Sequence, residues 1–131
     1  MDTYVEFDSE LFRPYLPDES QVSPGHYGAE LAFWLSRKLA QRGVITSYPQ
    51  REDWGWFIDY RSQDGHAYRL CCASRESSGD KWHCHVDRKT KSLFGRSKAP
   101  IEGAAPLIRA LYDVLMEEQG IRNVSWDVQE R

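Results

Sequence analysis

The sequence predicts an α+β domain with one mainly antiparallel sheet of five or six strands and two helices packed on one face. Two observations support this. Residues 24–42 and 102–119 carry apolar side chains at helical spacing, and the stretches around them carry apolar side chains at alternate positions. With 131 residues the chain has the usual length of one domain, so we expect residues 1–131 to fold as a single unit.

The first part of the chain predicts a short strand at residues 3–7 and then a helix at 24–42. Ser23 is a candidate N-cap, Pro24 suits the first helical position, and Gly43 suits the residue just past the end. Phe33 and Trp34 lie away from the main apolar side of this helix, and we expect them to contact the N-terminal loop or to face solvent or a partner. The apolar side itself is predicted to contain Tyr27, Leu31, Leu35 and Leu39.

After Gly43 the pattern changes to that of strands. Residues 44–46 are β-branched and predict a brief edge strand. Residues 54–60, 68–72 and 82–86 alternate between apolar and polar side chains, with turn residues at 62–65 and 77–80 between them. We therefore expect a three-stranded antiparallel meander, followed by the second helix and a last strand at 121–128. The side chains expected in the core are Leu31, Leu35, Trp56, Ile58, Leu70, Trp82, Val86, Ile108, Leu111 and Leu115.

Composition excludes several classes of protein. No apolar run approaches the ~18 residues of a membrane span, and the N-terminus has neither the positive charge nor the apolar run of a signal peptide. The three cysteines, Cys71, Cys72 and Cys84, are an odd number and include two sequence neighbours, so reduced thiols are expected rather than disulfides. These features favour a cytoplasmic protein that is not associated with a membrane.

The basic residues gather in the middle of the chain although the net charge is −3. Residues 88–98 include Lys89, Lys91 and Arg96, and a cluster of cations can contact phosphate or an acidic protein surface. Because the rest of the chain is acidic and would repel a polyanion, nucleic-acid binding is not expected. We instead expect a surface loop, anchored by Leu93 and Phe94, that contributes to contact with an acidic partner.

Alternate residues of one predicted strand suggest a metal site. His83, His85 and Asp87 point the same way in an extended chain and offer two imidazoles and a carboxylate to one ion. A further ligand would have to come from Asp59 or His66. The simpler interpretation is that these side chains form the polar face of the sheet.

Cys71 is a second candidate for chemistry. It points away from the face of Cys72 and Cys84, and His83 or His85 could approach it across the hairpin as a base. Nothing in the sequence presents the thiol on a loop or at a helix N-terminus, so packing is the favoured role.

The segment 50–56 is the most distinctive part of the sequence. Glu52 and Asp53 directly precede Trp54, and Gly55 separates Trp54 from Trp56. Both indoles are expected on one face of a strand, and Gly55 leaves room on the other face for a neighbour or a ligand. The segment is thus either a sheet core anchored by two indoles or a binding lip formed by Glu52, Asp53 and Trp54.

Residues 49–56, placed after a helix and a short strand and before Trp82, resemble a segment of small uncharacterised bacterial proteins known mainly as hypothetical proteins. The resemblance covers residues 25–90 and implies a bacterial cytoplasmic setting, but it transfers no functional residues. Candidate catalytic groups are scattered, so we expect a non-enzymatic protein without a cofactor that binds another protein, as an immunity protein or a regulatory adaptor does. The alternative is a metal-dependent enzyme that uses His83, His85 and Asp87.

Overall fold

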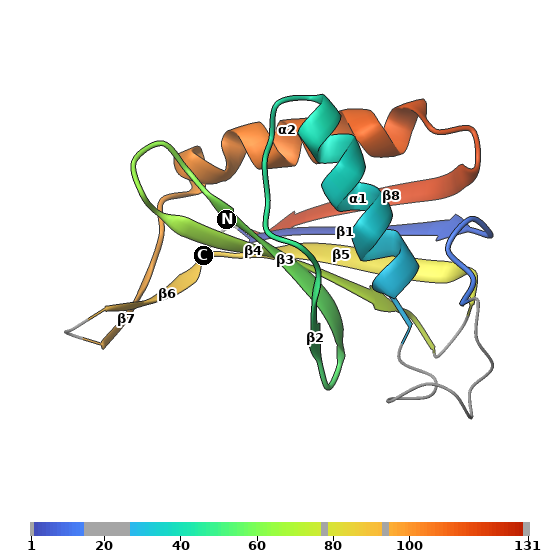
Figure 1. Ribbon diagram of the computed structural model, residues 1–131, viewed down its shortest axis with the longest axis horizontal. Coiled ribbons are helices and arrows are strands. Elements are labelled where there is room, and N and C mark those ends of the chain that lie inside the picture. The colour runs from blue at the N-terminus through green and yellow to red at the C-terminus, as the bar shows by residue number, and fades with distance from the viewer. Residues whose placement is uncertain (1, 15–26, 77–78, 93–94, 130–131) are drawn as a thin grey trace.

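The computed structural model describes residues 2–14, 27–76, 79–92 and 95–129, and it shows an α+β fold (Figure 1). Six strands form one sheet in the order β2-β3-β4-β5-β1-β8, and each neighbouring pair is antiparallel. Two further strands, β6 and β7, form a separate antiparallel ladder. In chain order the elements are β1 (Asp2–Ser9), α1 (Ala29–Gln41), β2 (Gln50–Glu52), β3 (Gly55–Arg61), β4 (Ala67–Ser74), β5 (Lys81–Asp87), β6 (Lys89–Ser92), β7 (Gly95–Lys98), the 3₁₀ turn η2 (Ile101–Ala104), α2 (Ala105–Glu117) and β8 (Ile121–Gln129).

Both helices cover the same face of the six-stranded sheet, as the sequence predicted (Figure 1). Leu31, Leu35 and Leu39 of α1 and Leu107, Leu111 and Leu115 of α2 are buried in one cluster with the inward-facing side chains of the strands. Alternation along the central strands supplies the other half of this core, which includes Val5, Phe7, Ile58, Leu70, Cys72, Trp82, Cys84 and Val86. Trp56 and Ile108, also expected in the core, are only partly buried and pack against it.

Helix α1 begins at Ala29, five residues later than predicted, and Gly28 is its N-cap. Gly28 has a φ of 146°, and a Cβ at this position would lie 2.9 Å from the carbonyl oxygen of Cys72. The chain therefore needs a glycine where it crosses β4, and the helix starts only after this crossing. Tyr27 precedes the helix rather than belonging to it, and the expected cap residues Ser23 and Pro24 lie outside the described residues.

The edge strand predicted at residues 44–46 is wrong. Val44 donates its amide hydrogen to the carbonyl of Leu39 and is buried below the end of α1, so it completes the helix terminus instead of starting a strand. Thr46 makes a single β-bridge with Tyr60, and the paired edge strand is β2, four residues further along.

The loop predicted at residues 88–98 contains the β6–β7 hairpin. Arg88 at its base is buried, its main chain accepts a hydrogen bond from the Ala99 amide at 2.8 Å, and its guanidinium donates to the Ala99 carbonyl at 3.4 Å. Leu93 and Phe94, expected to anchor this segment, lie outside the described residues. The contacts between Arg88 and Ala99 hold the two ends of the hairpin together.

Candidate functional site

The face of the six-stranded sheet opposite the helices is the candidate functional site, and we call it the open face. Neither helix lies on it (Figure 1). The side chains that alternate with the core residues of β1, β3, β4 and β5 therefore form its surface. Within the described residues these side chains are mostly half-exposed, with Tyr4, Glu6 and Asp8 on β1 and His83, His85 and Asp87 on β5.

A row of three rings lies at the centre of the open face. Tyr4 stacks on His83 with ring centroids 5.4 Å apart and an interplanar angle of 26°. His83 in turn stacks on His85 with centroids 6.4 Å apart and an angle of 6°. The β1–β5 register places Tyr4 opposite His85 and Glu6 opposite His83, so the row runs across two neighbouring strands.

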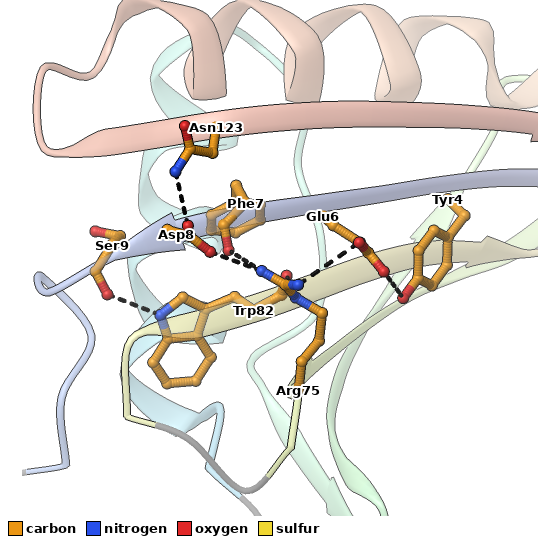
Figure 2. Close-up of polar contacts among 8 residues, drawn as sticks. All are labelled: Tyr4, Glu6, Phe7, Asp8, Ser9, Arg75, Trp82 and Asn123. Carbon is orange, nitrogen blue, oxygen red and sulfur yellow. Dashed lines mark hydrogen bonds and ion pairs between the residues drawn. The ribbon is translucent and has the colours of Figure 1, made fainter.

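Arg75 organises the polar side of this row, as Figure 2 shows. It reaches across β5, and its Nη1 lies 3.6 Å from Glu6 Oε2 while its Nη2 lies 2.7 Å from Asp8 Oδ1. The same guanidinium donates hydrogen bonds to the main-chain carbonyls of Phe7 and Trp82 at 3.2 and 3.0 Å. These four contacts fix the side chain, of which 23% remains exposed.

The network continues on both sides of Arg75 (Figure 2). The Tyr4 hydroxyl donates to Glu6 Oε1 at 3.0 Å, and Asn123 Nδ2 donates to Asp8 Oδ2 at 2.8 Å. Burial, followed by the hydrogen bond to Glu6, raises the pKa of Tyr4 to about 12, so its hydroxyl keeps its proton at neutral pH. The hydrogen bond from Asn123, with the nearby charges of Lys81 and Arg75, lowers the pKa of Asp8.

His83 is a neutral imidazole at neutral pH. Burial, and then repulsion by His85, lowers the pKa of His83 below its usual value. Its Nδ1 is buried and has no hydrogen-bond partner among the described residues. The ring thus serves as an aromatic surface between Tyr4 and His85 rather than as a charged group.

An aromatic and arginine cluster lies on the side of the open face nearer to β2. The Arg69 guanidinium carbon lies 3.7 Å from the centre of the Phe57 ring, and its Nε donates to Asp59 Oδ1 at 3.1 Å. Trp54 packs on Phe57 with centroids 6.5 Å apart. The guanidinium is thereby held over the aromatic ring, where its positive charge is attracted to the ring face.

The expectation that Trp54 and Trp56 share a face is wrong. Trp54 precedes β3 in the turn after β2, and it turns to the open face to contact Phe57, whereas Trp56 packs against the core. Gly55 allows this tight turn, because a Cβ there would lie 2.7 Å from the Cys72 carbonyl oxygen and 2.9 Å from the Ala73 Cβ. The space beside Gly55 is thus filled by strand β4.

The structure separates the three groups of candidate residues. Glu52, Asp53 and Trp54 lie at the exposed tip of the β2–β3 hairpin, and His83, His85 and Asp87 lie on the open face. Lys89, Lys91 and Arg96 belong to the β6–β7 hairpin, which projects away from the six-stranded sheet (Figure 1). In that ladder Lys91 is opposite Arg96, and Lys89 is opposite Lys98.

Within the described residues, no group of three or more His, Cys, Asp and Glu side chains is arranged to hold a metal ion. The β3–β4–β5 register places Arg69 between Asp59 and Asp87, and Arg69 is paired with Asp59, which was expected as an additional ligand. His66 directly precedes β4, whereas His83 pairs with Ala73 near the other end of that strand.

The cysteines are free and buried, in agreement with reduced thiols. Cys71 is opposite His85, as the sequence suggested, but burial raises the pKa of its thiol to about 12. A thiol with such a pKa is almost fully protonated at neutral pH and is a poor nucleophile. Cys72 and Cys84 face each other in the core with sulfur atoms 3.8 Å apart.

Sequence reasoning missed Tyr4, Glu6 and Arg75 as members of the site. The alternation of Tyr4 and Glu6 with Val5 and Phe7 was a usable signal, because it assigns both to the face opposite the core. Arg75 carried no such signal, since its partners on β1 are separated from it by 67 to 69 positions in the sequence.

Comparison of the chain with protein-family models, with curated proteins and with solved structures finds no match. In the described part of the chain, no helix is both long enough and apolar enough to cross a membrane.

Proposed function

We propose that this protein is a non-enzymatic, cytoplasmic protein that binds another protein through its open face, in the manner of an immunity protein or a regulatory adaptor. The observation that carries the proposal is the row of Tyr4, His83 and His85 beside a fixed arginine, on a sheet face that neither helix covers. Aromatic and arginine side chains are enriched at the energetic centres of protein interfaces.

The rigidity of these groups favours binding. Arg75 is held by four contacts and Arg69 is held between Phe57 and Asp59, so little side-chain entropy remains to be lost when a partner docks. Both arginines still expose part of the side chain, 23% and 41% respectively. The open face thus presents preformed polar anchors around an aromatic centre.

The charge balance of the open face favours a protein over a nucleic acid. Among the described side chains, the register assigns six acidic and five basic groups to this face: Glu6, Asp8, Glu52, Asp59, Asp87 and Asp127, and Arg61, Arg69, Arg75, Lys81 and Arg122. Binding to a phosphate backbone requires an excess of cations, because most of its affinity comes from neutralising phosphates. A balanced face instead suits a partner with charges of both signs.

Affinity capture from the native host tests this proposal, with mass spectrometry of the retained proteins. We expect a discrete protein partner that is retained by the wild type and by a matched Arg37→Glu variant, which alters an exposed residue of α1. A His85→Glu variant, with a charge at the centre of the ring row, should lose the same partner. Retention by His85→Glu as well would contradict binding through the open face.

The metal-dependent alternative predicts a different result. Elemental analysis of protein purified without an affinity tag would then show about one equivalent of a transition metal. This metal would be lost in a His83→Ala/His85→Ala variant. Such a result would replace the proposal of a binding protein by that of a metal-dependent enzyme with His83, His85 and Asp87 as ligands.

A further inference from the structure

The two edges of the sheet differ in a way that points to self-association. At one edge, β2 has three residues, all exposed, which is a usual way to protect an edge from pairing. At the other edge, β8 has nine residues, and among the described strands only β1 pairs with it. A long edge strand of this kind presents main-chain N–H and C=O groups that can pair with another strand.

An apolar strip accompanies the β8 edge on the helix side. Tyr112 and Met116 of α2 are 48% and 54% exposed, and the Tyr112 ring packs on Trp126 of β8 with centroids 5.8 Å apart. Val124 and Trp126 are only partly buried against the core. The indole Nε1 of Trp126 is buried and has no hydrogen-bond partner in the described structure.

A β-bulge arranges the charges of this edge. Asn123 has a φ of 56°, and the β1–β8 register shifts between Glu6 and Asp8. Arg122 is opposite Asp8, Ser125 is opposite Glu6, and Asp127 is opposite Tyr4. Because of the extra residue in the bulge, Arg122, three residues before Ser125, and Asp127, two residues after it, both belong to the open face, each opposite a β1 residue two positions from Glu6.

This arrangement is self-complementary. If two β8 strands pair antiparallel around a two-fold axis at Ser125, each Arg122 stands opposite Asp127 of the second copy. On the helix side, each Val124 stands next to Trp126 of the second copy. In a two-fold interface every contact occurs twice, with the roles of the two copies exchanged. The Arg122–Asp127 and Val124–Trp126 contacts both meet this requirement.

We propose that the protein is a two-fold dimer in which the β8 strands of two copies pair antiparallel around Ser125 and join two six-stranded sheets into one. The dimer makes the open faces of the two copies continuous and places the Tyr112 and Met116 strips near the axis. It uses the edge of the sheet and leaves the ring row free, so its success or failure is independent of the proposed binding function.

Charge reversal with a complementary pair of variants tests the dimer. Analytical ultracentrifugation of the wild type should show a concentration-dependent dimer. Asp127→Arg places two like charges opposite each other twice and should weaken the dimer more than about tenfold, as should Arg122→Asp. A mixture of the two variants should restore a dimer, because both arginines of the Asp127→Arg copy then face aspartates of the Arg122→Asp copy. Arg37→Glu is the matched control and should dimerise as the wild type does.

A second measurement does not depend on how these charge variants fold. In the dimer, Ser125→Cys places two thiols opposite each other at the axis, within the distance range of a disulfide. Diamide should oxidise the two thiols to one intermolecular disulfide, with transfer of two electrons and two protons to the reagent. An Arg122→Cys variant, away from the axis, should cross-link much more slowly. A wild type that stays monomeric at every concentration, or equal cross-linking of the two cysteine variants, would overturn the proposal.

Discussion

The two faces of the sheet are built from the same strands and differ in what holds their side chains. On β5, Trp82, Cys84 and Val86 are buried under the helices, whereas His83, His85 and Asp87 alternate with them on the open face. The helix side is held by apolar packing with few polar contacts. The open face is held by ion pairs, ring stacking and hydrogen bonds to main-chain carbonyls. We therefore expect most of the stability to come from the helix side, while polar contacts order the open face without covering it.

The largest effect is expected at Trp82, on the helix side of β5. Its side chain is fully buried, and its indole Nε1 donates to the Ser9 carbonyl at 3.0 Å. We expect Trp82→Ala to lower the free energy of unfolding by about 3–5 kcal/mol in urea denaturation. His85→Ala, on the open face of the same strand, is the matched comparison and should cost less than about 1 kcal/mol. Equal losses would show that the two faces contribute alike.

Gly55 is the next test, because both faces depend on the turn that it forms. Gly55→Ala adds a Cβ within 2.7 Å of the Cys72 carbonyl oxygen, which belongs to main chain and cannot move away easily. We expect a loss of about 1–3 kcal/mol in the free energy of unfolding. Gly43→Ala serves as a spatial control, since no atom of the described residues lies within 4 Å of a Cβ there. Its φ of 83° adds conformational strain of about 1 kcal/mol. A Gly55→Ala protein as stable as the wild type would exclude this account of the turn.

The pH dependence of protein stability tests the contribution of Asp8 on the open face. Its pKa is lower in the folded protein than in the unfolded chain, so its contribution to stability is complete above the unfolded pKa of about 3.9. The contribution is lost as the pH falls through the folded pKa. Asp8→Asn should therefore cost about 1 kcal/mol at pH 7, and the difference from the wild type should shrink at pH 3. A difference that is the same at both pH values would mean that the charge of Asp8 does not matter.

The smallest effect is expected at His83. Its folded pKa lies below the unfolded value of about 6.5, so the unfolded chain binds more protons as the pH falls. The folded state is therefore more stable above pH ~6.5 than at low pH, and this advantage is lost as the pH falls through the folded pKa of His83. Thermal melting between pH 5 and 8 should show a weaker pH dependence for His83→Gln than for the wild type. An unchanged dependence would place the titrating group elsewhere.

Alternation was sufficient to predict the helix side of the fold. The spacing of Leu31, Leu35 and Leu39 and of Trp82, Cys84 and Val86 fixes which side chains turn inward, because this depends only on local geometry. The same reasoning failed where a terminus or a turn intervened. Val44 completes the end of a helix through a local hydrogen bond to Leu39, which alternation does not detect. Trp54 turns out of the strand pattern at Gly55, where the main chain of β4, distant in the sequence, lies close.

The contacts of the open face could be predicted only in part. The pattern of β5 assigned His83, His85 and Asp87 correctly to this face. The position of β1 between β5 and β8 was not predictable, and it is this strand order that brings Tyr4 onto His83 and places Glu6 and Asp8 within reach of Arg75. The candidate site is thus a product of topology more than of any short motif.

Site-specific photo-crosslinking in the native host tests the central claim most directly. A photoreactive phenylalanine analogue at position 85 lies in the ring row of the open face, and the same analogue at the exposed Phe33 lies on the helix side as the comparison. We expect a discrete cross-linked partner protein from position 85 and none from position 33. Partner cross-links from position 33 alone, or from neither position, would contradict the account of the open face as a protein-binding surface.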